Sequence, residues 1–148
     1  MAEIKLVENW LEALLAQLEP AQRKKMMHRV AAGLRQQQQN NIRQQQNPDG
    51  STFEPRKING RAKQGRVKRQ MFSKLRTARY LKSSATGNEA EVSFSGQVQR
   101  IARVHHYGLR DRVRKGGPVV RYARRELLGI SEISEDLIQS LLIEHLSR

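Results

Sequence analysis

The chain has 148 residues and no cysteine, and its 28 Lys and Arg against 14 Asp and Glu give a formal net charge of +14. The lack of cysteine excludes disulfide bonds and thiolate metal sites. No apolar run approaches the ~20 residues that span a bilayer, and the N-terminus lacks the apolar core of a signal peptide. We therefore expect a protein made in the cytoplasm, with no membrane contact.

The apolar content is low for a chain of this length. Residues 1–148 fit one domain, but only 37% of them are hydrophobic and 5% aromatic. A small core of this kind indicates a domain that gains stability by assembling with partners.

The basic charge is concentrated in the middle of the chain. Residues 21–82 carry 17 Lys and Arg against two acidic residues, and residues 100–125 carry nine against Asp111. The segments 1–20, 83–99 and 126–148 are net acidic. A basic middle predicts contact with nucleic acid or with an acidic protein surface, and a merely solubilising surface is the alternative.

The first half of the chain has two helical patterns. Apolar residues at positions 4, 7, 11, 14, 15 and 18 predict an amphipathic helix over Ile4–Leu18, with Trp10 beside the apolar side, either capping the core or at an interface. Pro20 ends this helix and can begin the next, which we expect from Ala21 to about Gln46. Residues 36–46 are rich in glutamine. We expect a helix there rather than disorder because Gln is a fair helix former and Ile42 continues the apolar side.

A basic segment without periodicity follows. Asn47–Gly50 has the residue types of a β-turn, and residues 51–69 contain no helical or strand pattern. We predict that residues 47–69 form an extended basic loop or arm that faces a neighbouring subunit, acidic protein or DNA, with a solvated disordered loop as the alternative. The residues that we expect at the interface or facing DNA are Phe53, Arg56, Lys57, Arg61, Lys63 and Arg66, together with Trp10.

Residues 71–108 alternate between helical and strand patterns. Apolar residues at 71, 72, 75, 78 and 81 predict a helix over Met71–Leu81. A turn at Thr86–Asn88 precedes a half-buried strand at Glu91–Gly96. Arg100–Tyr107 has the pattern of a short helix, and Gly108 is placed to end it in the left-handed conformation.

The remaining residues predict short elements and a final helix. Leu109–Pro118 is an exposed strand or loop that runs into a turn, and Val119–Tyr122 is a short strand. We expect a helical turn over Ala123–Leu128, closed by Gly129. Residues 131–148 form the C-terminal helix, with Ser134 as its cap. The fold class is α+β: several amphipathic helices packed on a small antiparallel sheet, with a long basic loop.

The sequence contains no arrangement of residues that is typical of a catalytic or metal site. His105 and His106 are adjacent, so on a helix they diverge by about 100°, and no carboxylate lies at a metal-like interval. We predict no metal, no cofactor and no catalytic residue, and we do not expect an enzyme. We interpret His105, His106, Tyr107 and Gly108 as a structural motif, with Tyr107 packed beneath the loop that ends at Gly108. The chain also lacks the common nucleic-acid-binding signatures.

Three motifs resemble a known family. They are Asn47-Pro48-Asp49-Gly50-Ser51-x-Phe53-x-Pro55-Arg56-Lys57 with Met71-Phe72-x-Lys74-Leu75, then Ile101–Gly108, then Arg121-Tyr122-Ala123-Arg124-x-x-Leu127–Ser131. In this order they resemble the tail completion protein S family of contractile-tailed temperate phages, also called phage virion morphogenesis proteins. The resemblance covers essentially the whole chain.

The resemblance implies a structural function. It implies a virion protein that forms a ring at the head-proximal end of the tail and enables head–tail joining. The implied partners are further copies of the chain (a hexamer is favoured because contractile tails have sixfold ends), the terminal tube and sheath proteins, head-connector or neck proteins, and DNA in the lumen, contacted non-specifically. Two alternatives remain: a basic nucleic-acid-binding protein, and an assembly chaperone absent from the mature virion.

Overall fold

The computed structural model describes residues 16–56 and 70–147. Within these ranges the chain forms three helices and two antiparallel two-stranded sheets, so the predicted α+β class is confirmed. The predicted helix at 4–18 lies almost entirely outside the described residues, and so do Trp10 and residues 57–69 of the predicted basic loop.

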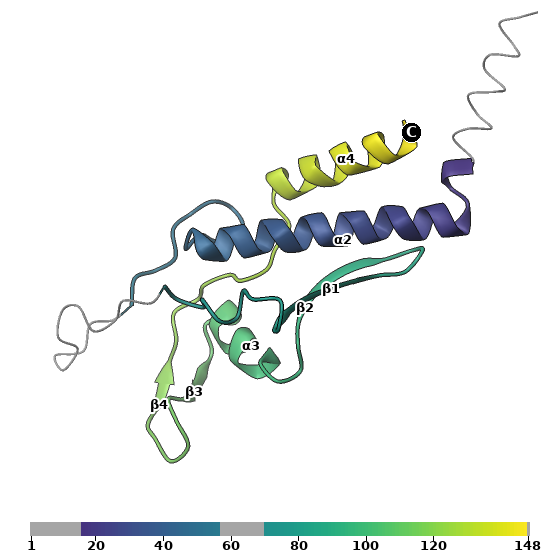
Figure 1. The fold of residues 1–148 in the computed structure, drawn as a ribbon. Helices are drawn as coiled ribbons and strands as arrows, with labels where there is room; N and C mark the ends of the chain where they lie inside the picture. The colour runs from purple at the N-terminus through teal and green to yellow at the C-terminus, as the bar shows by residue number, and fades with distance from the viewer. Residues whose placement is uncertain (1–15, 57–69, 148) are drawn as a thin grey trace, which may run out of the picture.

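The longest element is α2, Pro20–Arg43, which begins with proline at its first turn and is about 36 Å long. Its buried positions include Val30, Leu34, Gln38 and Ile42, which recur every four residues and so form one side of the helix. The predicted helix is confirmed as far as Arg43, including the glutamines up to position 39. Figure 1 shows α4 along one side of α2, and β1, β2 and α3 along the other.

The C-terminal helix α4, Glu132–Leu146, packs on α2 where α2 has a glycine. A Cβ at Gly33 would lie 3.0 Å from Leu141 Cδ1, so this glycine permits close approach of the two helices. The predicted N-cap, Ser134, lies three residues after the observed one. Ser131 is the cap, because its Oγ accepts from the Ser134 backbone N–H at 3.3 Å. Ser134 is instead buried in the first turn, where its hydroxyl donates to Gln37 Oε1 at 2.6 Å.

The first sheet is a hairpin packed under α2. β1, Leu81–Ala85, pairs antiparallel with β2, Ala90–Phe94, so that Leu81 lies opposite Phe94 and the chain reverses at residues 86–89. The predicted turn and second strand are confirmed, whereas β1, largely exposed, was not predicted.

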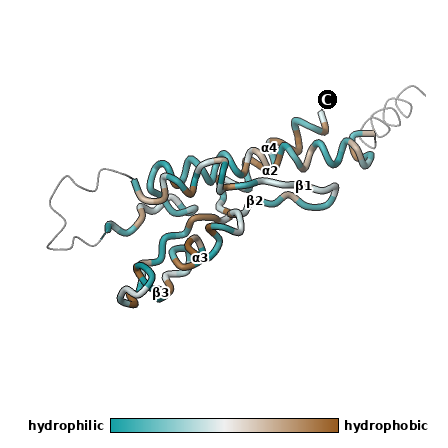
Figure 2. The backbone as a smooth tube through the Cα atoms, turned by 60° about the horizontal axis from the view of Figure 1, so that its bottom comes forward, coloured by the Kyte–Doolittle hydropathy of each residue, from teal (hydrophilic) through white to brown (hydrophobic). Residues whose placement is uncertain are grey.

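A hydrophobic cluster joins the β1–β2 hairpin to the C-terminal end of α2. Figure 2 shows hydrophobic positions gathering around α3 while much of α2 is hydrophilic. The buried cluster consists of Ile42, Phe53, Leu75, Leu81, Phe94, Val98, Ala102 and Leu127.

The predicted helix at Met71–Leu81 is wrong. Residues 71–80 form successive turns, and Phe72 has a φ of 62°, which is incompatible with a continuous helix. The side-chain amide of Gln45 also binds this backbone, donating to the Met71 carbonyl at 2.9 Å and accepting from its N–H at 3.0 Å. Leu75 belongs to the buried core although it lies in a turn, and Met71 and Phe72 pack against the same core. The apolar spacing of residues 71–81 therefore arises from burial and not from a helix.

The second sheet is separate from the first. After α3, Gln99–Tyr107, strand β3, Arg110–Arg112, pairs antiparallel with β4, Val119–Arg121. The predicted strand at 119–122 is confirmed, but there are two small sheets where we expected one. In Figure 1 the β3–β4 hairpin projects from the body beside α3.

Candidate interaction site

The end of α3 requires a glycine. Gly108 has φ 66° and ψ 53°, as the sequence predicts, and the following Leu109 N–H binds the Val104 carbonyl at 2.9 Å. A Cβ on Gly108 would lie 2.9 Å from the backbone nitrogen of Arg124. The glycine therefore serves two purposes: it reverses the chain, and it lets the later segment pass directly against α3.

That later segment, residues 122–129, is extended, so the predicted helical turn over Ala123–Leu128 is wrong. Its N–H groups are bound by other parts of the chain. Arg125 N–H donates to the His105 carbonyl at 2.9 Å, and Leu127 N–H donates to His106 Nδ1 at 3.2 Å. Because these donors have partners on α3, the segment has no need of local helical bonds.

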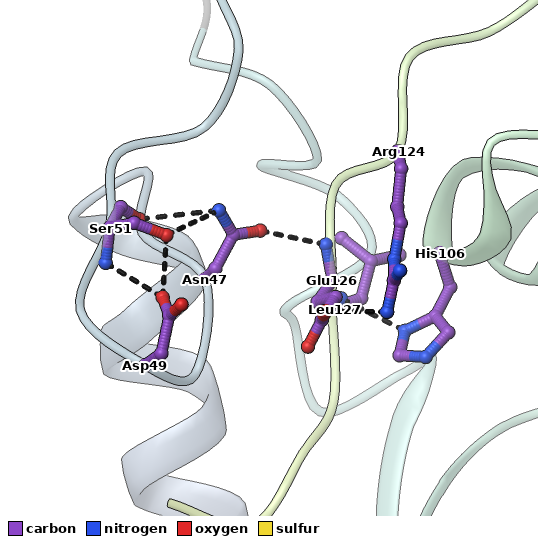
Figure 3. A network of polar contacts seen from close by, with 7 residues as sticks. All are labelled: Asn47, Asp49, Ser51, His106, Arg124, Glu126 and Leu127. Atoms are coloured by element: carbon purple, nitrogen blue, oxygen red, sulfur yellow. Dashed lines mark hydrogen bonds and ion pairs between the residues drawn. The ribbon is translucent and has the colours of Figure 1, made fainter.

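The turn at Asn47–Ser51 supplies another partner. Gly50 N–H donates to the Asn47 carbonyl at 2.9 Å, which confirms the predicted turn, and Asn47 Oδ1 accepts from Glu126 N–H at 2.8 Å. Asp49 accepts from both the hydroxyl and the N–H of Ser51, and the hydroxyl bond is the main reason that the pKa of Asp49 is lowered. Figure 3 shows Asn47 between this turn and the extended segment, with His106 on the segment's other side.

The two histidines have different surroundings. His105 packs edge-on against Phe72 and Tyr122, with ring centroids 5.1 and 4.7 Å away. Its buried Nδ1 has no hydrogen-bond partner among the described residues. Burial lowers the pKa of His105, and the nearby Arg125 lowers it further.

His106 is partly buried and binds the backbone. Burial is the main cause of its lowered pKa, with Glu126 opposing and Arg124 adding to the shift. Since His106 Nδ1 accepts from Leu127, the neutral ring is the form that fits. The prediction that Tyr107 packs beneath the loop is wrong. Tyr107 is 59% exposed, because its neighbours His105 and His106 occupy the side of α3 that meets residues 122–127.

Arg125 connects residues 122–129 to the first part of the predicted basic arm, residues 47–69, by hydrogen bonds. Its buried guanidinium donates to the carbonyls of Glu54 at 2.7 Å and Pro55 at 3.2 Å, and burial lowers its pKa. Phe53 is 2% exposed and packs against Phe72 in this chain's own core, so the prediction that it anchors an arm on a neighbouring surface is wrong. Sequence reasoning missed Arg125, since nothing in a basic run marks one arginine as buried.

A groove lies beside these residues. It has a volume of about 830 Å³ and is lined by residues 54–56, 71–72, 105, 113, 120–123 and 125. Arg56 is exposed and lines this groove. The other predicted interface residues, Lys57, Arg61, Lys63, Arg66 and Trp10, lie outside the described residues.

The described ranges contain neither a cluster of metal ligands nor a membrane-spanning helix. Residues 16–56 and 70–147 contain no group of three His, Cys, Asp or Glu side chains that could hold a metal ion. In the same ranges no helix is long and apolar enough to span a bilayer.

The fold and the site thus define a small, basic α+β protein in which residues 122–129 are hydrogen-bonded both to α3 and to the Asn47–Ser51 turn. The model of the phage virion morphogenesis family matches residues 2–147, and the chain belongs to that family. It is 38% identical over 150 residues to the Tail completion protein S of Escherichia phage P2, and the match covers all of both chains. The resemblance seen in the motifs is therefore confirmed. No solved structure is significantly similar to the chain.

Proposed function

We propose that this protein completes the phage tail: it forms a homo-oligomeric ring at the head-proximal end of the tail and enables head–tail joining. The observation that carries the proposal is the full-length similarity to a relative named Tail completion protein S. Family membership over residues 2–147 supports it.

The surface of the described chain supports an assembly role. Ile130, Ile133 and Ile143 are 63%, 66% and 64% exposed, and all three lie on or beside α4. Large apolar side chains gathered on one exposed element are typical of a surface that a partner covers. A protein that is completed by neighbours needs only the small core found here.

The proposed position determines the proposed partners. The ring, a hexamer in the favoured form, lies between the terminal tube and sheath proteins on one side and the head-connector or neck proteins on the other. Non-specific contact with DNA in the lumen is consistent with the net charge of +14. The function is structural, with no catalytic step, and the protein is made in the host cytoplasm and retained in the virion.

Removal of the gene from the phage that carries it tests this function. We expect free heads and unjoined tails in electron micrographs, and infectious particles on resupply of the protein from a plasmid. The protein should be present in purified virions at a fixed number of copies per tail. Joined particles without the gene would contradict the function. Restored joining with no protein in the virion would favour an assembly chaperone. Binding to free DNA with no defect in tails would favour a nucleic-acid-binding protein.

A further inference from the structure

One face of the β3–β4 hairpin carries basic and apolar residues only. Arg110 lies opposite Arg121, and Arg112 lies opposite Val119. Directly opposite residues of an antiparallel pair share a face, and all four are exposed. We call these four residues the hairpin face.

Arg110 and Arg121 of the hairpin face have no anionic partner among the described residues. Like charges directly opposite each other are unfavourable, yet neither Arg110 nor Arg121 pairs with a carboxylate in residues 16–56 and 70–147. The neighbouring carboxylate, Asp111, alternates to the other side of the strand and binds Arg100 at 2.7 Å. The hairpin face is therefore suited to an anionic partner from outside the chain.

The outward side of α4 has the opposite charge. Positions 132, 136 and 143 lie on the same side of an α-helix, with position 133 next to them. We call Glu132, Ile133, Asp136 and Ile143 the helix face; all four are exposed, and α4 contains no Lys or Arg. Neither Glu132 nor Asp136 forms an ion pair within the described ranges. The other side of α4 is the one that packs on α2, near Gly33.

The two faces lie on opposite sides of the molecule. Figure 1 shows α4 along one side of α2 and the β3–β4 hairpin projecting on the other. One chain therefore does not pair its own two faces. A contact between different surfaces of two identical copies is heterologous, and it generates a closed ring when the rotation between copies closes.

We propose that the hairpin face of one copy docks on the helix face of the next. This proposal rests on the ring proposed above and names the two surfaces that form it. Arginines opposite carboxylates supply attraction and orientation. The apolar residues within each face, Val119 on the hairpin and Ile133 and Ile143 on the helix, are then buried together.

The exposed apolar residues favour a second copy over DNA. Val119 is 56% exposed and Val113, in the loop of the same hairpin, is equally exposed. A phosphate backbone offers the arginines a partner but does not bury valine side chains. The helix face offers both kinds of contact.

Paired charge reversal tests the docking. One variant is Arg110→Glu/Arg121→Glu, which removes no hydrogen bond found in the described structure, and the other is Glu132→Lys/Asp136→Lys. The matched control for the first is Lys24→Glu/Lys25→Glu, which makes the same change of charge at exposed positions of α2. Each is supplied from a plasmid to the phage that lacks the gene, and infectious particles are counted.

We expect each interface variant alone to lose roughly a hundredfold or more of the particles, because like charges then meet at every contact of the ring. The two variants expressed together should restore particles, since each hairpin then meets a helix of opposite charge in an alternating ring. The control should match the wild type. Circular dichroism and thermal unfolding of the purified variants establish that they fold. If either double reversal unfolds, Arg110→Gln/Arg121→Gln and Glu132→Gln/Asp136→Asn replace them, with a smaller expected loss for each alone.

The other outcomes separate this proposal from the proposed function. If the wild type restores particles and both variants also do so alone, the docking is overturned while tail completion stands. If only the hairpin variant fails and co-expression does not rescue it, the hairpin contacts DNA or another protein and the docking is overturned. If the wild type itself does not restore joined tails, the function fails.

Discussion

The side-chain amide of Gln38 forms two hydrogen bonds with the backbone of Gly129. Gln38 Nε2 donates to the Gly129 carbonyl at 2.9 Å, and Gln38 Oε1 accepts from the Gly129 N–H at 3.2 Å. Gln38 is buried in the C-terminal half of α2, and Gly129 ends the segment that follows β4 and passes against α3. The side-chain amide thus supplies the two hydrogen bonds that a neighbouring strand would supply in a sheet. It satisfies the N–H and the carbonyl of Gly129, which belongs to neither sheet.

Gln38→Leu should lower the free energy of unfolding by about 1–3 kcal/mol, because it leaves the partly buried N–H and carbonyl of Gly129 without their partner. Urea unfolding followed by circular dichroism measures the change. Gln36→Leu, at an exposed position of the same glutamine run, is the matched control and should stay within about 0.5 kcal/mol. Equal losses for the two variants would show that the bonds to Gly129 contribute nothing specific.

Gly108→Ala should destabilise the protein by about 1–3 kcal/mol from its positive φ, and further because the new Cβ meets the Arg124 backbone. Gly116→Ala is the control for the first effect alone. Gly116 also has a positive φ, 75°, but nothing lies within 4 Å of its Cβ position. The difference between the two melting temperatures measures the close approach at Arg124. A larger loss at Gly116 would contradict the packing described for Gly108.

Acid should destabilise the fold below about pH 6.5, the ordinary pKa of histidine. The pKa values of His105 and His106 are lowered in the folded chain, so in this range the unfolded state binds more protons. Stability should therefore fall as the pH drops from 7 towards 5. The carboxyls of Asp49 and Asp111, with lowered pKa values, add a further loss only near and below pH 4.

His106→Asn should flatten part of that dependence, since Asn carries an acceptor near the position of Nδ1 and does not titrate. Unfolding in urea at pH 7 and pH 5.5 gives the comparison. His28→Asn makes the same substitution at an exposed position of α2 and is the matched control. A dependence that is identical in the wild type and His106→Asn would mean that protonation of His106 is not coupled to folding.

Phe53→Ala should cost about 3–5 kcal/mol, the usual range for truncating a buried aromatic residue. Tyr107→Ala, at an exposed aromatic residue, should cost well under half as much. Thermal unfolding of the purified chain tests both. If Phe53→Ala folds with unchanged stability and affects only assembly, then Phe53 contacts a neighbour, as the sequence alone suggested.

The sequence predicted the elements that depend on local chemistry. The start of α2 at Pro20, the turn at Asn47–Gly50 and the left-handed Gly108 follow from residues whose backbone preferences are strong. The strand at Glu91–Phe94 and the C-terminal helix followed from apolar spacing, because each lies with one side against the body. The motifs were sufficient to indicate the family.

Tertiary structure determined the conformation of the segments whose backbone hydrogen bonds are made with residues distant in the sequence. Residues 71–80 and 122–129 have helix-like spacing, but distant groups bind part of their backbone. Gln45 binds the N–H and the carbonyl of Met71 at the start of the local turns over 71–80. In the second segment the N–H groups of residues 125, 126, 127 and 129 donate to His105, Asn47, His106 and Gln38. Arg125 and Phe53 are also buried by residues that are distant in the sequence: Arg125 binds Glu54 and Pro55, and Phe53 packs against Phe72. Periodicity records which side chains avoid water, and it carries no information on which distant group satisfies a given backbone amide.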